Sequence, residues 1–454
     1  MKLSIALTLV ILTIAAALGW RGRQELSEVR RTHQKLVAEA AELGISSDSA
    51  RAGGGPLATK RGIREDKQAE AKQAAAEFIA FAREMEDVEK RGQQPDPETM
   101  KRIMTFMDRM LSLDGEQLKA VIQAVRDEPN LKDETRQGLI MFSIMSLASD
   151  HPRAAVSLFT ESSDLLGDQG EMMGKHIVGS ALATWAKDDP MGALEWVRKN
   201  GESHPDLVND ETKASLLSGV ASKDPALAFD LLGQLYGKAE LDAHSDPGTA
   251  ISRITGAART PEERTATLAA LRAYAAARAS DSMREGALHG GLRSLTFGSG
   301  YRNAGYESTT TWLDSANLTP AELTAATQNI EHSVRLEDSG RWIEWLGRSD
   351  LPEKKSNERI HRLASEWTRE DYQAAGQWLA TAPDSSAKQT AVQAYAQTVF
   401  PYEPDIAVQW ANTLPAGKTR QQTFEAIHKS MPRNSDAEKA AAEAFATEHG
   451  IEKP

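Results

Sequence analysis

The chain has 454 residues and contains 53 Lys and Arg against 65 Asp and Glu, which gives a formal net charge of −12 at pH 7. This acidic balance argues against general nucleic-acid binding, because contact with phosphates needs a basic face. A chain of this length normally forms two or three compact domains, although stacked helical repeats can continue over it as one body. The Ala-, Gln-, Glu-, Lys- and Arg-rich composition favours helices, and we find no segment with the pattern of a strand.

The N-terminal segment, residues 1–23, is apolar and flanked by basic residues. Residues 3–20 carry no charge, and Arg21 and Arg23 follow them. A helix of this length spans about 27 Å, close to the thickness of a bilayer core. We therefore expect a signal anchor. A cleaved signal peptide is the alternative, because residues 15–17 are all alanine, which suits a cleavage site.

Both readings of this segment favour an exported body. We expect an inner-membrane anchor with the body in the periplasm, and the alternative is cleavage that leaves a soluble periplasmic or secreted protein. The absence of cysteine is consistent with an oxidising compartment. Basic residues lie on both flanks of the segment, so its orientation stays open and a cytoplasm-facing body on the same anchor is a further alternative.

Three segments follow the anchor. Residues 24–43 place apolar side chains at alternating spacings of three and four, the pattern of a short coiled coil that would pair two copies as a homodimer. The alternative is an amphipathic helix lying against lipid or the body. Residues 44–66, which include three consecutive glycines, predict a flexible linker. Residues 67–134 predict an N-terminal helical capping region that begins with an Ala-rich helix over 67–89.

A tryptophan recurs through the C-terminal half of the chain. The spacing is 32 or 33 residues, at Trp312, Trp345, Trp378 and Trp410. A fixed period in this range indicates stacked helical hairpins. One Trp per unit is typical of a residue that locks each hairpin onto the next. The alternative is a row of exposed rings that holds a peptide or a glycan on a concave face.

The residues ahead of each tryptophan predict a helix start. Pro190 lies six positions before Trp196, Pro404 lies six before Trp410, and an acidic residue precedes both prolines. An acidic N-cap residue accepts hydrogen bonds from the first backbone N–H groups, and proline at the first helical position loses no donor. We therefore predict that each tryptophan lies about two turns into the second helix of its unit.

Each unit is predicted to run helix, tight turn, helix and proline turn. A hydrophobic residue closes the first helix at Leu147, Trp185, Val220, Trp367 and Phe400. Proline turns follow the second helix at Pro320, Pro352, Pro383 and Pro415. Weaker units fit the same template around Pro152, Pro225 and Pro261, and a last unit covers residues 424–445.

These units predict an all-α fold: a right-handed α-solenoid of about 7 to 9 helical hairpins over residues 135–454. The unit resembles tetratricopeptide and related helical-repeat proteins in its length and two-helix design, over about residues 135–450. Here, however, Ala follows the proline after three residues and Trp after six, whereas the tetratricopeptide pattern places Trp early in the first helix and Pro at the unit's end. Peptide-tail recognition is therefore not carried over to any residue.

Catalytic signatures are missing from the sequence. There is no His-Glu-x-x-His pair for zinc and no Gly-x-Ser-x-Gly elbow for a nucleophile. The nearest approach to a phosphate loop, Gly417-Lys418-Thr419, has Asn412 where the first glycine is required. We interpret it as a turn between helices. The expectation is no catalytic residue, no cofactor and no metal.

The glycine-rich unit 289–306 is the one candidate for a local ligand site. It gathers glycines and aromatic residues where the repeat predicts a first helix and its turn. Each glycine costs a helix about 1 kcal/mol relative to Ala, so some gain offsets it. Close helix packing is one explanation. The other is a ligand-contacting loop that uses Tyr301, Arg302 and Tyr306.

Two functions fit these observations. The first is a membrane-tethered or exported helical-repeat scaffold that binds protein or peptide partners on its solenoid surface, which needs no catalytic residues. The alternative is an exported enzyme or glycan-binding module with its site near residues 289–306.

Overall fold

The computed structural model describes residues 60–90, 98, 101–102, 105, 109, 113–236, 248–278, 280–298 and 305–451. Over these residues the regular secondary structure consists of helices and includes no β-strand, which confirms the all-α prediction. The predicted anchor at 1–23 and the predicted coiled coil at 24–43 lie outside the described residues. Within the described ranges, none of the helices has both the length and the apolar character that crossing a bilayer requires.

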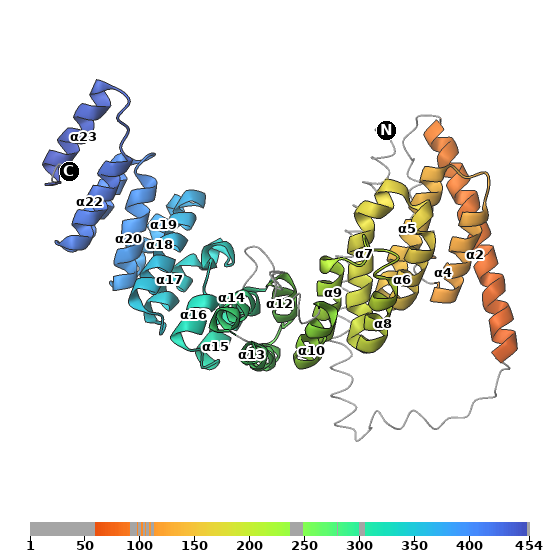
Figure 1. Cartoon of the computed structure of the whole chain (residues 1–454). Coiled ribbons are helices and arrows are strands. Elements are labelled where there is room, and N and C mark those ends of the chain that lie inside the picture. Colours follow the sequence, from red (N-terminus) through yellow and green to blue (C-terminus); the bar gives the residue numbers. More distant parts are fainter. Residues whose placement is uncertain are drawn as a thin grey trace, which may run out of the picture. The chain divides into compact units, whose positions relative to one another are not determined.

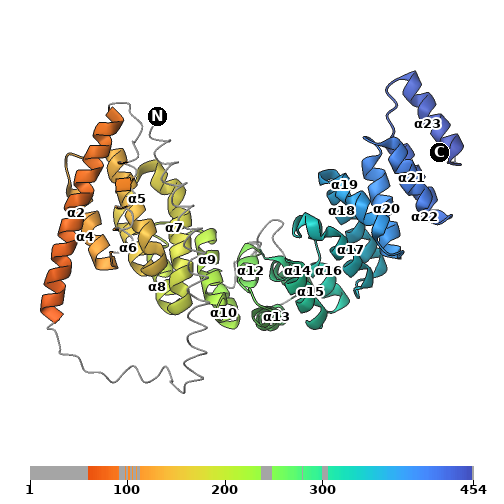
Figure 2. The ribbon, with the colours of Figure 1, turned by 180° about the vertical axis from the view of Figure 1, so that it is seen from behind.

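Figures 1 and 2 show the helices from opposite sides. Their bounds are α2 (Lys60–Lys90), α4 (Gly115–Asp127), α5 (Asp133–Asp150), α6 (Pro152–Ser162), η2 (Ser163–Leu165), α7 (Gly167–Asp188), α8 (Pro190–Asn200), α9 (Asp210–Ala221), α10 (Pro225–Tyr236), α12 (Gly248–Thr255), α13 (Pro261–Ala276), α14 (Asp281–Phe297), α15 (Tyr306–Ser315), α16 (Pro320–Ala326), η3 (Ile330–His332), η4 (Leu336–Asp338), α17 (Ser339–Arg348), α18 (Glu353–Glu370), α19 (Tyr372–Thr381), α20 (Ser386–Val399), α21 (Pro404–Thr413), α22 (Lys418–Ser430) and α23 (Asp436–Glu448).

The chain divides into two compact units, residues 1–181 and 182–454. In the first unit α2 packs against α4, α4 against α5, and α5 against α6. The face of α2 that carries Ala75, Phe78 and Ala82 is buried, as its helical spacing predicts. This helix begins at Lys60, inside the segment expected to be a linker. Its first residues include Lys, Arg and Glu and no proline, and these helix-compatible residues outweigh the cost of one glycine, Gly62.

In the second unit each helix packs mainly against helices close to it in the sequence. Helix α9 contacts α8, α10 and α12, and α14 contacts α12, α13 and α16. Towards the C-terminus α18 contacts α17, α19 and α20, and α20 contacts α21 and α22 (Figure 1). This neighbour-to-neighbour packing is the repeat-like architecture that the recurring tryptophan predicts.

One backbone bend recurs where a first helix passes into a second. The residue immediately before the second helix, which we call the elbow residue, has φ/ψ of −131/57° at His151, −140/76° at Asp189, −151/81° at Asp371 and −135/73° at Glu403. Each elbow N–H donates to the carbonyl four residues earlier, over 2.8 to 2.9 Å. At the first three elbows this single residue is all that separates the two helices. The predicted tight turn is therefore confirmed.

Two of the acidic elbow residues, Asp189 and Asp371, act as N-caps through their side chains. Asp189 Oδ1 accepts from the N–H of Gly192 at 2.9 Å, and Asp371 Oδ1 accepts from that of Ala374 at 2.9 Å. Glu403 makes no side-chain cap bond, although its backbone has the same bend. Because the cap bond needs a short side chain, aspartate serves and glutamate does not.

The four recurring tryptophans lie in second helices, as predicted, but they differ in burial. Trp312 in α15 and Trp345 in α17 are fully buried, whereas Trp378 in α19 and Trp410 in α21 are half-buried. Trp378 lies against the preceding second helix: a Cβ added at Gly340 would lie 2.5 Å from its ring. The core interpretation therefore holds fully for two of the four and in part for the others.

Candidate functional site

Two of the glycines of the unit 289–306 have a clear structural role, one in packing and one at a helix end. Gly291 lies within α14, and a Cβ added there would lie 2.7 Å from Leu271 Cδ2 in α13. Gly298 ends α14 with a φ of +71°, a conformation that glycine adopts without strain. The packing explanation accounts for Gly291 and the helix end accounts for Gly298.

Tyr306 belongs to the core. Its side chain is 8% exposed, and its ring meets the ring of Trp342 edge-on with centroids 5.2 Å apart. The guanidinium of Arg341 lies 4.0 Å from the centre of the same ring, and Arg348 donates to the Tyr306 hydroxyl at 3.4 Å. Tyr301 and Arg302 lie outside the described residues. Of the three predicted ligand contacts, the structure therefore places only Tyr306, and it places that ring among packed side chains.

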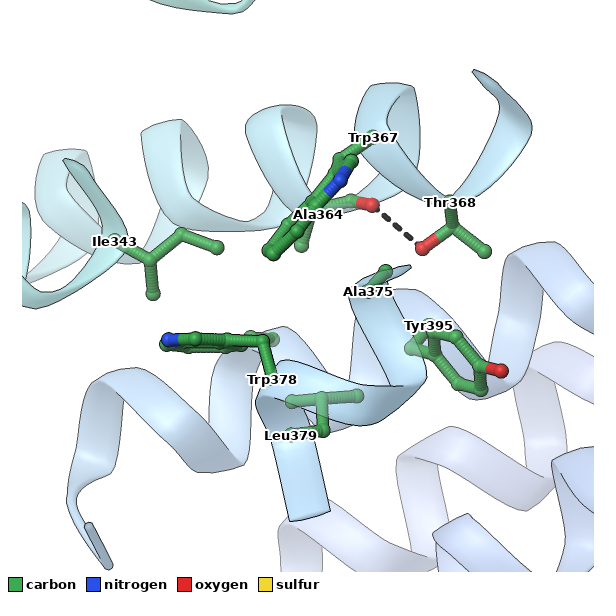
Figure 3. Close-up of a pocket in the computed structure, with 9 residues that line it drawn as sticks. Ile343, Ala364, Trp367, Thr368, Ala375, Trp378, Leu379 and Tyr395 are labelled. Carbon is green, nitrogen blue, oxygen red and sulfur yellow. Dashed lines mark hydrogen bonds between the residues drawn. The ribbon is translucent and has the colours of Figure 1, made fainter. Parts of the chain in front are cut away.

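An aromatic recess lies among α17, α18, α19 and α20 (Figure 3). Its outline encloses about 160 Å³ with open solvent included, and the space between the side chains has room for little more than one water molecule. Its lining residues are Ile343, Ala364, Trp367, Thr368, Ala375, Trp378, Leu379, Ala391 and Tyr395. Almost all of them are apolar or aromatic, so the walls of this small recess are apolar.

Two indole rings form opposite sides of this recess. The centroids of Trp367 and Trp378 are 5.8 Å apart with their planes at 50°, and Figure 3 shows the gap between them. Trp378 packs against Gly340 of α17, while Trp367 lies on the buried face of the long helix α18. The two rings are thus fixed by helices of successive hairpins, and the gap between them is a product of hairpin packing.

The polar groups of the recess are already engaged or neutral. Thr368 Oγ1 donates to the carbonyl of Ala364 at 2.7 Å. Burial raises the pKa of the Tyr395 hydroxyl above its ordinary value of 10.0, and the electrostatic influence of Tyr372 and Glu403 acts in the same direction. The hydroxyl therefore stays protonated at neutral pH. With no carboxylate or histidine in its lining, the recess contains no acid–base pair.

The sequence predicts no metal site. Within the described ranges, no group of three or more His, Asp or Glu side chains is placed to hold an ion. His361 Nε2 lies 3.0 Å from Gln397 Oε1, and His428 Nε2 lies 3.2 Å from a guanidinium nitrogen of Arg433. Gly417 has a φ of +139° and precedes α22, which is the predicted turn between helices.

Two tryptophans that shape this region, Trp342 and Trp367, do not belong to the series with the 32- or 33-residue spacing. Trp342 is fully buried at the centre of an aromatic cluster with Phe297, Tyr306 and Trp345. Trp367 was predicted to close a helix, and the structure adds that its ring lines the recess. The available signal for Trp342 was its position three residues before Trp345, which puts both on one helical face. No protein-family model matches this sequence, and a search of curated proteins finds no significant match.

Proposed function

We propose that this protein is a helical-repeat scaffold that binds a protein or peptide partner, anchored on the surface around the aromatic recess. The half-buried ring of Trp378 carries the proposal, because part of this aromatic side chain stays exposed beside a recess without catalytic groups. Aromatic side chains supply large contact area at low entropic cost and dominate binding at interfaces.

The proposal includes a finer architecture, in which the hairpins continue as a right-handed α-solenoid. Two observations support it. First, the elbow conformation recurs at four places in the chain. Second, two of the recurring tryptophans contact the second helix of the preceding hairpin: Trp345 contacts Asp314, and Trp378 contacts Gly340. A repeated joint with a repeated contact generates a repeated stacking step.

The N-terminal part of the proposal rests on sequence. Residues 1–23 would tether the scaffold to a membrane or direct its export to the periplasm, and residues 24–43 would pair two copies. The alternative function, an enzyme or glycan-binding module near residues 289–306, has no supporting observation among the described residues. Burial of Tyr306 removes one of its three proposed contacts from the surface.

A site-specific photo-cross-linker tests the proposal. It is placed at the exposed Gln377, beside Trp378, in the full chain within its native cells. The expected result is a discrete cross-linked partner that is lost in Trp378→Leu. The matched control is Trp196→Leu, because Trp196 is a half-buried tryptophan at the equivalent point of α8 and does not line the recess. Cross-linking that is equally strong in both variants would contradict the surface around the recess as the anchor.

A further inference from the structure

The fourth residue of the second helix is a buried alanine in most hairpins. The alanines in this position, each at most 3% exposed, are Ala155, Ala193, Ala228, Ala375 and Ala407. Three consecutive second helices depart from this pattern: α13, α15 and α17 carry Arg264, Thr309 and Trp342 there (Figure 1). A position that holds a methyl group in five hairpins thus holds a larger side chain with a polar atom in three adjacent ones.

Each of these three side chains has a polar atom without a partner. Nε of Arg264, Oγ1 of Thr309 and Nε1 of Trp342 are buried and form no hydrogen bond. Nine buried side-chain atoms of the described residues are in this state, and eight of them belong to residues between 264 and 359. Buried polar groups are normally paired, because burial without a hydrogen bond costs free energy. The polar groups of these hairpins are therefore less well satisfied than those in the rest of the described chain.

The backbone is irregular over the same hairpins. A single elbow residue joins α18 to α19, whereas residues 327–338, with η3 and η4, separate α16 from α17. Two described residues other than glycine have a positive φ, Asn317 at 47° and Asn329 at 54°, and both lie here. Short 3₁₀ segments have poorer hydrogen-bond geometry than α-helices, and left-handed residues other than glycine are strained. The joint before α17 thus lacks the short elbow that fixes other hairpins.

Glu331, in η3, interacts with two arginines of α18. Glu331 and Arg359 are buried, with 7% and 5% of their surfaces exposed. Oε1 of Glu331 is 3.9 Å from Nη1 of the exposed Arg362, which is beyond hydrogen-bond distance, and Oε2 has no partner. Burial lowers the pKa of the Arg359 guanidinium, and the charges of Glu358 and Glu331 act in the opposite direction. The Glu331 carboxylate is therefore attracted by both arginines and hydrogen-bonded to neither.

We propose that residues 305–338 form a hinge within the second unit, with two packings in which Glu331 pairs either with Arg359 or with Arg362. The first packing pairs two buried groups that now lack partners, and the second places the carboxylate on an exposed guanidinium. Two discrete arrangements are expected because packed interfaces switch between alternatives and do not deform continuously. The hinge goes beyond the proposed function and holds whatever partner binds, since it changes the separation of α13 and α17.

The test measures two distances in the full chain in mild detergent by double electron–electron resonance. The chain has no cysteine, so each pair of spin labels is attached to two introduced cysteines at exposed positions. The hinge pair, Ala266→Cys with Glu344→Cys, joins α13 to α17. The control pair, Glu344→Cys with Gln409→Cys, joins α17 to α21. All three positions are the sixth residue of a second helix, so each pair spans one intervening hairpin.

The hinge pair is expected to show two distance populations and the control pair a single narrow one. Arg362→Gln should reduce the hinge pair to one population, because the Glu331 carboxylate then has only Arg359. Arg369→Gln is the matched control and should leave both populations. Both arginines are exposed on α18, and each variant loses a hydrogen bond to a glutamate of the same helix, Glu358 or Glu366.

Two results would overturn the inference. A hinge pair with one distance population as narrow as that of the control pair would show that residues 305–338 hold a single packing. Two populations that persist unchanged in Arg362→Gln would show that Glu331 does not select between them. The cross-link expected from Gln377 depends on neither distance, so the hinge and the proposed function can fail separately.

Discussion

The indole N–H of Trp345 donates a 2.8 Å hydrogen bond to Oδ1 of Asp314, which ties α17 to the preceding second helix, α15. Trp345 is buried, whereas Asp314 is exposed and reaches the indole from the edge of the interface. An indole nitrogen carries one N–H donor and no acceptor, so this single hydrogen bond satisfies it.

Asp314→Ala should therefore destabilise the protein by about 1 to 2 kcal/mol, because the buried indole N–H loses its acceptor. Asp314→Asn should cost less, since the amide oxygen accepts in the same place. The free energy of unfolding in urea, followed by circular dichroism, measures both. As a control, Asp230→Ala removes an exposed aspartate in α10 and should change the stability by less than about 0.5 kcal/mol. Equal values for the Asp314→Ala and Asp230→Ala variants would show that the bond contributes nothing.

Gly340 in α17 predicts an overpacking effect. A Cβ at this position would lie 2.5 Å from Cδ1 and Nε1 of Trp378, so Gly340→Ala must displace the ring. We expect a loss of about 1 to 3 kcal/mol despite the better helix propensity of alanine. Gly233→Ala is the matched control, because Gly233 lies in α10 with open space around it and should gain up to about 1 kcal/mol. If displacement of Trp378 is the cause, Gly340→Ala should cost much less when combined with Trp378→Leu.

The elbows predict unequal effects of two acidic residues. Asp371→Ala removes a cap bond to the N–H of Ala374 and should cost about 1 kcal/mol, while Asp371→Ser should retain most of the stability. Glu403→Ala, at an elbow of the same conformation without a cap bond, should change the stability far less. The melting temperatures of the three variants measure these differences in stability. A cost at Glu403 as large as that at Asp371 would mean that elbow charge, rather than the cap bond, is responsible.

The Arg272–Glu322 pair predicts a pH dependence. Arg272 Nε and a terminal guanidinium nitrogen donate to the two Glu322 oxygens at 2.7 and 2.8 Å, joining α13 to the capping box of α16. These hydrogen bonds from Arg272 lower the pKa of Glu322 below its ordinary value of 4.5, against the opposing effect of burial. The carboxylate therefore contributes stability that is fully present above about pH 4.5 and is lost as the pH falls through its lower folded-state pKa.

Glu322→Gln retains the capping geometry and removes the charge. It should cost about 1 kcal/mol near pH 7, and the difference from the wild type should shrink as the pH falls below about 4.5. Urea titrations at several pH values measure this difference. The exposed Glu195→Gln is the control and should show a flat difference. A Glu322→Gln difference that does not change with pH would place the stabilisation in packing instead of charge.

Local signals in the sequence predicted the helix starts well. A cap residue and a proline act on their own helix, so Asp189-Pro190 and Thr260-Pro261 marked α8 and α13 without any knowledge of tertiary contacts. The tryptophan period likewise predicted second helices, because a stacking contact that repeats in space repeats in sequence.

The recess was not predictable in the same way. Trp378 is half-buried because Gly340, in the preceding hairpin, lets its ring lie flat against α17. Trp367 comes from a first helix and Tyr395 from the next hairpin, so no window of sequence contains the site. Tyr306 shows the converse: an aromatic residue beside glycines resembles a ligand contact until Trp342 and Arg341 are found packed on its ring.

The elbow at Asp371 has a consequence for how such a chain can change length. An extra residue in α18 would rotate the exit of α19 by about 100°, since an α-helix has 3.6 residues per turn. The proline turns have no such constraint: Pro352 lies seven residues after Trp345, and Pro383 lies five after Trp378. Insertions and deletions should therefore survive at the prolines and be eliminated at the elbows. Duplication or loss of a whole hairpin between two proline turns would lengthen or shorten the array and keep every joint intact.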